Sequence, residues 1–315
     1  MVAHEDGADR DAGAQPWLGV GGPRYRPPSV ALVCTAMTPI YVIAEIGINH
    51  NGSLDTAKRL IDAAKEANCQ AVKFQKRTIE AVYTPDDLAR PRDSPFGRTN
   101  GDLKRGLEFG PDGYAVLDRY CRDADLDWSA SCWDVASVAV IAAFNPPWLK
   151  IPSALITDVS LLHCYAATRL PIIMSTGMSS WEEIDEAVTQ LGHGYPSLIL
   201  THCHSSYPSP LDELNLACIQ SLKDRYRTYP WIRVGYSSHT VSPWPCLMAA
   251  VYGAEVIEFH LTLDRASWGS DQSASLEPHA AKKLVEEIRT WERCKGDGEK
   301  RVYASEEAVK AKLRR

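Results

Sequence analysis

The sequence predicts a (β/α)8 barrel, the single-domain α/β fold also called a TIM barrel, in which eight parallel strands alternate with eight helices. From Tyr41 onward, an apolar run, a polar loop and an amphipathic segment recur eight times, at intervals typical of βα units. The chain has 315 residues, of which 45% are hydrophobic, and this is enough for one barrel of roughly 250 residues.

Each strand and helix follows from a local pattern. The apolar runs predict strands at 41–45, 71–75, 127–131, 148–151, 172–175, 198–202, 233–236 and 256–260. The amphipathic segments predict helices at 54–67, 114–124, 136–144, 158–167, 180–191, 214–225, 244–252 and 278–294. Ser180 followed by Glu183 forms a capping box, and Gly192 stands where a helix end favours positive φ. An open, doubly wound sheet is the alternative, but no glycine-rich dinucleotide fingerprint supports it.

We expect three parts: an irregular, partly flexible N-terminal extension at 1–38, the catalytic barrel at 39–295 and a tail at 296–315. The extension mixes Gly, Pro, Asp and Arg without a period, although its apolar run 30–34 would suit a short edge strand. The first residues lack the pattern of a signal peptide, and no apolar run approaches the ~20 residues of a membrane span. We therefore expect no membrane partner.

Charge and cysteine content exclude other classes. The 34 basic and 40 acidic residues are spread along the chain and give a formal net charge of -6, which argues against a nucleic-acid partner. Nine cysteines form no CxxC pair, and their scatter through apolar segments predicts reduced, mostly buried thiols. This indicates the cytoplasm.

In this fold the active site lies on the loops after the strands, so polar residues at strand ends are the candidates. His239 and His260 end two neighbouring predicted strands. Two neutral imidazoles could share a divalent ion and leave positions open for water and substrate. The alternative is that each histidine only satisfies backbone groups at its strand end.

Two lysines, Lys73 and Lys150, also stand at strand ends. Buried ammonium groups need partners, so this placement predicts a ligand that carries phosphate and carboxylate. An internal pair between Lys73 and Glu45 is one alternative, and a nucleophilic Schiff-base lysine is another. Hydroxyl groups on the same rim would add donors: Ser153, Ser175 and Ser237.

Two carboxylates have candidate roles of their own. Glu45 ends the first strand and could act as a general acid or base, because burial raises the pKa of a carboxyl group toward neutrality. Its alternative role is to pair with a lysine of the rim. Asp271 could orient a sugar hydroxyl, although an Asp in a Gly-Ser-Asp loop needs no function.

Seven segments share the features of a known family. They are IAEIGINHNG at 43–52, VKFQ at 72–75, LKIPSA at 149–154, MSTGM at 174–178, HCHSSYP at 202–208, GYSSHT at 235–240 and IEFHLTLDR at 257–265. In order and without a gap, the chain from about 41 to 315 resembles the sialic acid synthase family, the N-acetylneuraminate synthases. The resemblance implies condensation of phosphoenolpyruvate with an open-chain N-acylated aldose, by default N-acetylmannosamine. The products would be a nonulosonic-acid-type 2-keto-3-deoxy sugar acid and phosphate.

The resemblance also implies roles for individual residues. The metal ligands would be His239 and His260, which would hold Mn²⁺ or, alternatively, Mg²⁺ or Co²⁺. Glu45 would be the acid or base, and His260 would count among the catalytic residues. The phosphate and carboxylate of phosphoenolpyruvate would meet Lys73, Ser131, Lys150, Ser153, Ser175 and Ser237. The sugar and metal region would be lined by Gln75, Ser205, Tyr207, Glu258 and Asp271.

The sequence departs from the family on the acceptor side. Leu155 stands where some members have a sugar-contacting glutamate, and Ser205 replaces a common asparagine. The family usually continues into a small antifreeze-like domain, which in a homodimer supplies an arginine to the partner's sugar site. The sequence ends at Arg315, where that linker would begin. These departures leave the acceptor open, and a homodimer would rest on barrel contacts.

Two further hypotheses remain. A different phosphoenolpyruvate aldol synthase would use a phosphorylated aldose and would want additional cations, for which the strand-end loops offer mainly Arg77 and Arg265. A non-catalytic paralogue would bind a sugar acid only. The joint presence of Glu45, the two lysines and the two histidines disfavours this last hypothesis.

Overall fold

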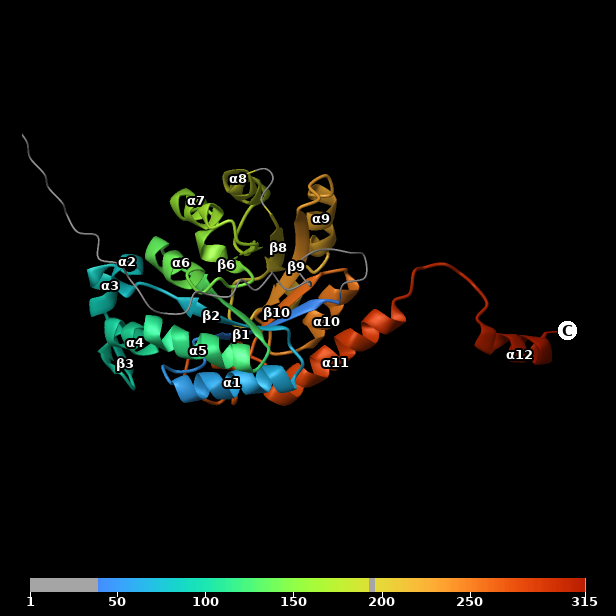
Figure 1. Ribbon diagram of the computed structural model, residues 1–315, viewed down its shortest axis with the longest axis horizontal. Coiled ribbons are helices and arrows are strands. Elements are labelled where there is room, and N and C mark those ends of the chain that lie inside the picture. Colours follow the sequence, from blue (N-terminus) through green and yellow to red (C-terminus); the bar gives the residue numbers. More distant parts are fainter. Residues whose placement is uncertain (1–38, 193–195, 315) are drawn as a thin grey trace, which may run out of the picture.

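A computed structural model describes residues 39–192 and 196–314. Its main sheet is a closed barrel of eight parallel strands in the order β1-β10-β9-β8-β7-β6-β5-β2, with the helices arranged around it (Figure 1). The strands are β1 Tyr41–Gly47, β2 Ala71–Lys76, β5 Asp127–Cys132, β6 Leu149–Ile151, β7 Ile172–Ser175, β8 Leu198–Cys203, β9 Ile232–Ser238 and β10 Val256–His260. The predicted (β/α)8 fold is confirmed. The predicted edge strand at 30–34 lies outside the described residues.

The eight predicted helices are all present. They are α1 Leu54–Glu66, α5 Pro111–Asp123, α6 Val135–Ala142, α7 Val159–Ala167, α8 Trp181–Leu191, α9 Cys218–Arg225, α10 Trp244–Val251 and α11 Pro278–Cys294. The capping box of α8 is formed, since Glu183 N donates to Ser180 Oγ at 3.3 Å and Ser180 N to Glu183 Oε2 at 2.7 Å. Gly192 has φ +89°, as predicted. Helix α9 begins later than predicted, because a 3-10 turn at Leu211–Glu213 and a positive φ at Asn215 precede it.

An insertion between β2 and α5 was not predicted. It comprises α2 Ile79–Val82, α3 Pro85–Ala89, a hairpin of β3 Pro91–Ser94 and β4 Gly97–Thr99, and α4 Asn100–Leu107. Helices α2 and α3 have four and five residues, too few for a clear hydrophobic period. Helix α4 has eight residues and buries Leu103 and Leu107, four positions apart, so its pattern could have been found. The insertion packs on the loop after β1, where a Cβ on Gly52 would lie 2.2 Å from Gly106 O. Glycine at position 52, with φ +74°, permits this close approach.

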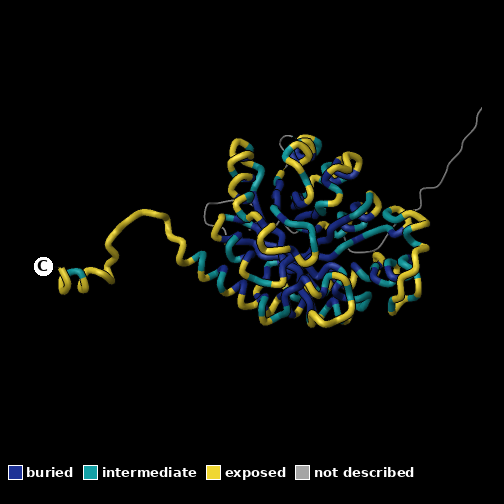
Figure 2. The backbone as a smooth tube through the Cα atoms, turned by 180° about the vertical axis from the view of Figure 1, so that it is seen from behind, coloured by how far each residue is buried: buried dark blue, intermediate teal, exposed yellow. Residues whose placement is uncertain are grey.

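The predicted tail contains one more helix, α12 Ala304–Leu313, which the sequence pattern did not indicate. Figure 2 shows this segment exposed except at Lys310, which is partly buried. One short 3-10 helix, Ser153–Leu155, follows β6, and another, Gln272–Ala274, precedes α11. Within the described ranges, no helix combines the length and apolarity that crossing a membrane requires.

Alternate residues of each strand face opposite sides of the barrel wall. Outward side chains pack against the helices and form the larger core. Inward side chains form a second, smaller core that fills the amino-terminal half of the barrel, and its members are Tyr41, Ile43, Ala71, Trp148, Ile173, Ile199 and Val256. Figure 2 shows this buried centre in dark blue. Toward the carboxyl end, the inward positions become polar.

We predict that the interior core controls the stability of the barrel. Trp148 is fully buried there, and its Nε1 donates to Tyr41 Oη at 3.3 Å. Trp148→Ala should therefore lower the free energy of unfolding by about 3–5 kcal/mol, since it leaves a cavity. Trp244→Ala is the matched control, because that side chain is 60% exposed and should change the free energy by less than about 1 kcal/mol. Urea denaturation of both variants measures this, and equal shifts would contradict it.

Candidate active site

The polar inward positions surround a pocket of about 160 Å³ at the carboxyl end of the barrel. Every site residue proposed from the sequence lines this pocket except Asp271. They are Glu45, Lys73, Gln75, Ser131, Lys150, Ser153, Ser175, Ser205, Tyr207, Ser237, His239, Glu258 and His260. The strand-end rule, which selects polar residues at the carboxyl ends of the predicted strands, therefore locates one continuous site. It is built by β1, β2, β5 to β10 and the loops after them.

Four buried charged groups form a row along the pocket wall. Lys150 Nζ lies 3.0 Å from Glu258 Oε2, and Glu258 Oε1 lies 3.6 Å from Lys73 Nζ. Lys73 Nζ in turn lies 2.8 Å from Glu45 Oε2. The internal Lys73 and Glu45 pair, one of the alternatives above, is thus present, and both residues line the pocket as well. We call Lys150, Glu258, Lys73 and Glu45 the charge row.

Hydroxyl groups complete the hydrogen bonding of the charge row. Ser237 Oγ donates to Glu258 Oε1 at 2.9 Å, and Lys73 Nζ donates to Ser131 Oγ at 2.8 Å. These contacts follow from the parallel register, in which Ser237 pairs with Glu258 and Lys73 with Glu45 across neighbouring strands. The barrel therefore fixes both the charges and their partners.

Burial and neighbouring charges separate the pKa values of the two carboxyl groups. Burial raises the pKa of Glu45 to about 7, with Lys73 opposing that rise and Glu258 adding to it. Burial also acts to raise the pKa of Glu258, but Lys150 and Lys73 bring it down to about 2. At neutral pH, Glu258 is therefore a stable carboxylate, whereas Glu45 can gain or lose a proton.

The ammonium groups differ as well. Burial acts to lower the pKa of both lysines, but Glu258 and Glu45 together raise the pKa of Lys73 above its usual value. The pKa of Lys150 is lowered by burial, and Glu258 offsets this only in part. Lys73 is thus the more firmly charged of the two.

The two imidazoles lie side by side in the same pocket. The ring centroids of His239 and His260 are 5.3 Å apart. His239 Nδ1 lies 2.5 Å from His204 O and must carry the proton, so Nε2 accepts the hydroxyl hydrogen of Tyr207 at 2.9 Å. Burial lowers the pKa of each imidazole to about 3. Both rings are therefore neutral, which is the form that binds metal ions.

The donor set fits a loosely held divalent ion. His260 Nδ1 is buried without a hydrogen-bond partner, and Asp271 Oδ2 lies 3.9 Å from it. In the ranges that the structure describes, no three His, Cys, Asp or Glu residues form a complete metal cluster. An ion here would take two imidazoles from the protein and leave its other positions to water and substrate. That arrangement suits a catalytic ion rather than a structural one.

Other polar strand-end residues serve the structure instead. Asn49 Nδ2 donates to Leu261 O at 2.9 Å, and His50 stacks on Phe109 with centroids 4.2 Å apart. His202 Nε2 bonds to Leu214 O at 2.7 Å. None of the three lines the pocket.

Sequence reasoning missed four pocket-lining residues: Trp133, Pro152, Ala154 and Met178. Trp133 directly follows β5, so the strand-end rule could have found it if aromatic residues had been included. Met178, which has φ +60° and is largely exposed, lies at the pocket entrance.

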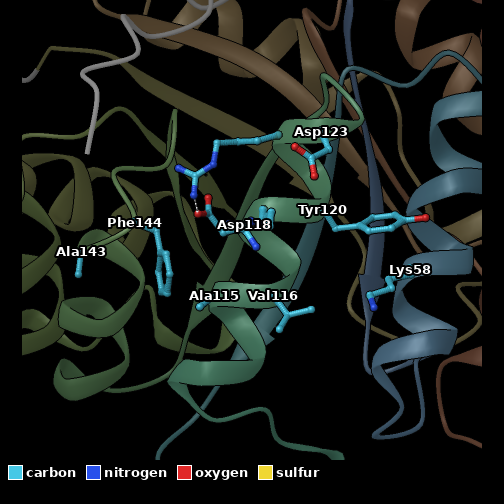
Figure 3. A pocket seen from close by; sticks show the side chains of 10 residues that line it. Lys58, Ala115, Val116, Asp118, Tyr120, Asp123, Ala143 and Phe144 are labelled. Atoms are coloured by element: carbon cyan, nitrogen blue, oxygen red, sulfur yellow. Dashed lines mark hydrogen bonds and ion pairs between the residues drawn. The ribbon is translucent and has the colours of Figure 1, made fainter. Parts of the chain in front are cut away.

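A larger hollow lies elsewhere, on the outer face of the barrel. It has a volume of about 720 Å³ and is open to solvent; its lining residues come from α1, α5 and the two residues that follow α6 (Figure 3). Arg122 pairs with Asp118 there, and Lys58 Nζ lies 5.8 Å from the centroid of the Tyr120 ring. Because the charge row and the imidazoles lie in the smaller pocket, we place the active site there.

Known proteins are similar to this chain in sequence and in fold. An N-acetylneuraminate-9-phosphate synthase of Drosophila melanogaster is 37% identical over 255 residues, which cover 80% of this chain and 68% of that protein. An N,N'-diacetyllegionaminic acid synthase of Legionella pneumophila is 34% identical over 289 residues, which cover 87% of this chain and 78% of that protein. The crystal structure of a sialic acid synthetase of Leptospira borgpetersenii in complex with citrate has a TM-score of 0.75 at 32% identity, covering 88% of this chain and 93% of that one.

More remote matches agree on the fold alone. A truncated 3-deoxy-D-arabino-heptulosonate 7-phosphate synthase of Thermotoga maritima has a TM-score of 0.59 at 12% identity.

A model of the NeuB family matches residues 60–300, which span most of the barrel. Together with the close relatives, this match shows that the chain belongs to the NeuB family.

Proposed function

We propose that this chain condenses phosphoenolpyruvate with the aldehyde of an open-chain N-acylated aldose, forming a carbon–carbon bond and releasing phosphate. The observation that carries the proposal is the charge row beside two neutral imidazoles in one pocket. Family membership supports it, since the relatives named above are an N-acetylneuraminate-9-phosphate synthase and an N,N'-diacetyllegionaminic acid synthase. The N-acetylmannosamine skeleton is the acceptor that we propose.

The lysines would hold phosphoenolpyruvate. They are the cations that line the pocket, and the hydroxyls of Ser153, Ser175 and Ser237 lie around them. Ammonium groups form charge-assisted hydrogen bonds to phosphate and carboxylate oxygens, and binding phosphoenolpyruvate in a fixed position orients carbon 3 toward the acceptor. Because Lys73 and Lys150 are both ion-paired, we favour this role over a Schiff base.

The reaction balances in three steps. Carbon 3 of phosphoenolpyruvate attacks the aldehyde carbon, and the aldehyde oxygen takes up a proton. Water adds at carbon 2, which has become electron-poor, and the resulting tetrahedral intermediate loses phosphate by C–O cleavage. Glu45, with a pKa of about 7, can accept the proton of the attacking water. Glu258 would keep both ammonium groups charged throughout.

His239 and His260 would hold the divalent ion, for which Mn²⁺ is our proposal and Mg²⁺ and Co²⁺ are alternatives. Such an ion supplies Lewis-acid polarisation of the aldehyde oxygen. The Tyr207 hydroxyl donates to His239 Nε2, so this hydrogen bond would have to break before that nitrogen could bind the ion. The Tyr207 ring lies against both imidazoles and would still shield the site from solvent.

The described cysteines are consistent with a reducing compartment. Eight of them are free thiols, and Cys69, Cys121, Cys132, Cys203 and Cys246 are buried. We propose the cytoplasm on this basis. The homodimer stays a prediction from the family resemblance.

The proposal is tested by phosphate release from phosphoenolpyruvate with a panel of aldoses. We expect release with N-acetylmannosamine or its derivatives, together with a 2-keto-3-deoxy acid in equal amount. Neutral hexoses without an N-acyl group should give little release. If no aldose of the panel causes release in the presence of Mn²⁺, Mg²⁺ or Co²⁺, the condensation is disproved and a binding role remains.

The imidazole pair generates a prediction about the metal. Removal of the ion with EDTA should abolish phosphate release, and Mn²⁺ should restore it. His260→Ala should weaken Mn²⁺ binding at least about tenfold, because one of two protein ligands is lost. His202→Ala is the matched control, since that ring contacts Leu214 O outside the pocket. Calorimetry or electron paramagnetic resonance measures binding directly, and equal affinity in both variants would refute the assignment.

The charge row generates a prediction about phosphoenolpyruvate. Lys150→Met should weaken its binding by about 1.5–3 kcal/mol, which is tenfold or more, because a charge-assisted hydrogen bond is lost. Lys76→Met is the control: its Nζ pairs with Glu108 at 2.7 Å, so it also loses a buried ion pair, but it lies outside the pocket. The affinity of this control variant for phosphoenolpyruvate should stay within about twofold of the wild-type value. A similar loss in both variants would mean that the effect comes from stability, which thermal unfolding would show.

A further inference from the structure

Two residues that directly follow neighbouring strands meet at the rim of the pocket. Arg77 follows β2 and Trp133 follows β5, and Trp133 N donates to Lys76 O at 3.0 Å. Arg77 Cζ lies 4.1 Å from the centroid of the Trp133 ring. The guanidinium is thus held over the indole by a cation–π contact. Trp133 lines the pocket, and Arg77 lies directly behind this lining, in contact with the Trp133 ring.

The Arg77 guanidinium also contacts the pocket through Gln75. Arg77 Nη2 donates to Gln75 Oε1 at 2.7 Å, and Gln75 Nε2 donates to Glu45 Oε1 at 3.1 Å. These two bonds fix the orientation of the Gln75 amide. The guanidinium is therefore fixed beside a residue of the predicted acceptor region rather than beside the lysines of the charge row.

This guanidinium lacks a carboxylate partner within residues 39–192 and 196–314. The neighbouring acid, Glu108, accepts from the Arg77 backbone N at 3.2 Å, and its other oxygen pairs with Lys76 Nζ at 2.7 Å. The Arg77 side chain directly contacts a neutral amide and an aromatic face, and the charge of Glu108, which is shared with Lys76, acts on it only from a distance. This half-buried cation is therefore incompletely compensated. An anionic ligand would complete it.

Two unpartnered donors lie at the same place. Arg77 Nε and Trp133 Nε1 are both buried, and neither has a hydrogen-bond partner. Buried N–H groups without acceptors cost free energy, and two of them in contacting side chains indicate a missing acceptor.

We propose that Arg77 and Trp133 form a subsite for an anionic group of the acceptor, and that this group is a phosphoryl group on the N-acylated aldose. The inference rests on the proposed condensation and names its substrate class. Arginine suits phosphoryl oxygens because its planar fork offers several donors. Arg265, the other cation at a strand end, is exposed and donates to Ser273 O, so it lies outside this wall.

The test compares N-acetylmannosamine with its 6-phosphate as acceptors, measuring kcat and KM for each and KM for phosphoenolpyruvate. The wild-type protein should prefer the phosphorylated sugar in kcat/KM. Arg77→Met should raise KM for the phosphorylated acceptor about tenfold or more and change KM for phosphoenolpyruvate by less than about twofold. Arg265→Met, the matched control, should leave all values unchanged.

Two more variants separate binding from folding. Trp133→Phe keeps the ring under Arg77 and removes only Nε1, so it should raise KM for the phosphorylated acceptor with an unchanged thermal midpoint. Arg77→Lys keeps the charge but loses the planar fork, and should restore only part of the affinity. Equal losses with both sugars, or a rise in KM for phosphoenolpyruvate, would overturn the subsite. Absence of turnover with both sugars in the wild type would instead refute the condensation itself.

Discussion

Burial of four alternating charges is the constraint on which the rest of this structure depends. Each member of the charge row is almost completely shielded from water, and an isolated ion in that position would be very unfavourable. The row is tolerable because positive and negative groups alternate and, when Glu45 is ionised, sum to zero. Removing one member would leave a buried charge without a partner, which typically costs more than the pair contributes. The cluster therefore stabilises little by itself and needs the barrel core to hold it.

The closure of the barrel produces this alternation. Strand β1 pairs with β2 on one side and with β10 on the other, so that Glu45 lies level with Lys73 and with His260. Residues far apart in the chain become neighbours at one height. The apolar layer below, which includes Trp148, excludes water from the amino-terminal half and lowers the dielectric around the row. A site preorganised in this way can stabilise developing charge without rearranging.

Much of this could be predicted from the sequence, because period and position carry the information. Apolar repeats predicted all eight barrel strands and their eight helices, whereas α2 and α3, between β2 and α5, are too short to show a period. The strand-end rule collected the pocket, but it also collected His202, whose side chain does not enter it. The alternation of side chains along a strand explains the difference. Ile199 faces the interior of the barrel, so residue 202, an odd number of positions further along β8, faces outward. Lys73 faces inward and Lys76 outward for the same reason. Which carboxylate meets which lysine depends on barrel closure, and no local pattern encodes that.

The two sides of the pocket differ in how completely they are satisfied. Glu45, Lys73, Lys150 and Glu258 compensate one another, and all four lie in segments that resemble the sialic acid synthases. Arg77 and Trp133 lie just outside those segments, and they keep unpartnered donors. A change in the compensated row would disturb four charges at once, whereas a change at Arg77 would alter one contact to the acceptor. This asymmetry separates the two tasks of the pocket: the charge row is a unit that changes only as a whole, whereas the acceptor side can change one contact at a time.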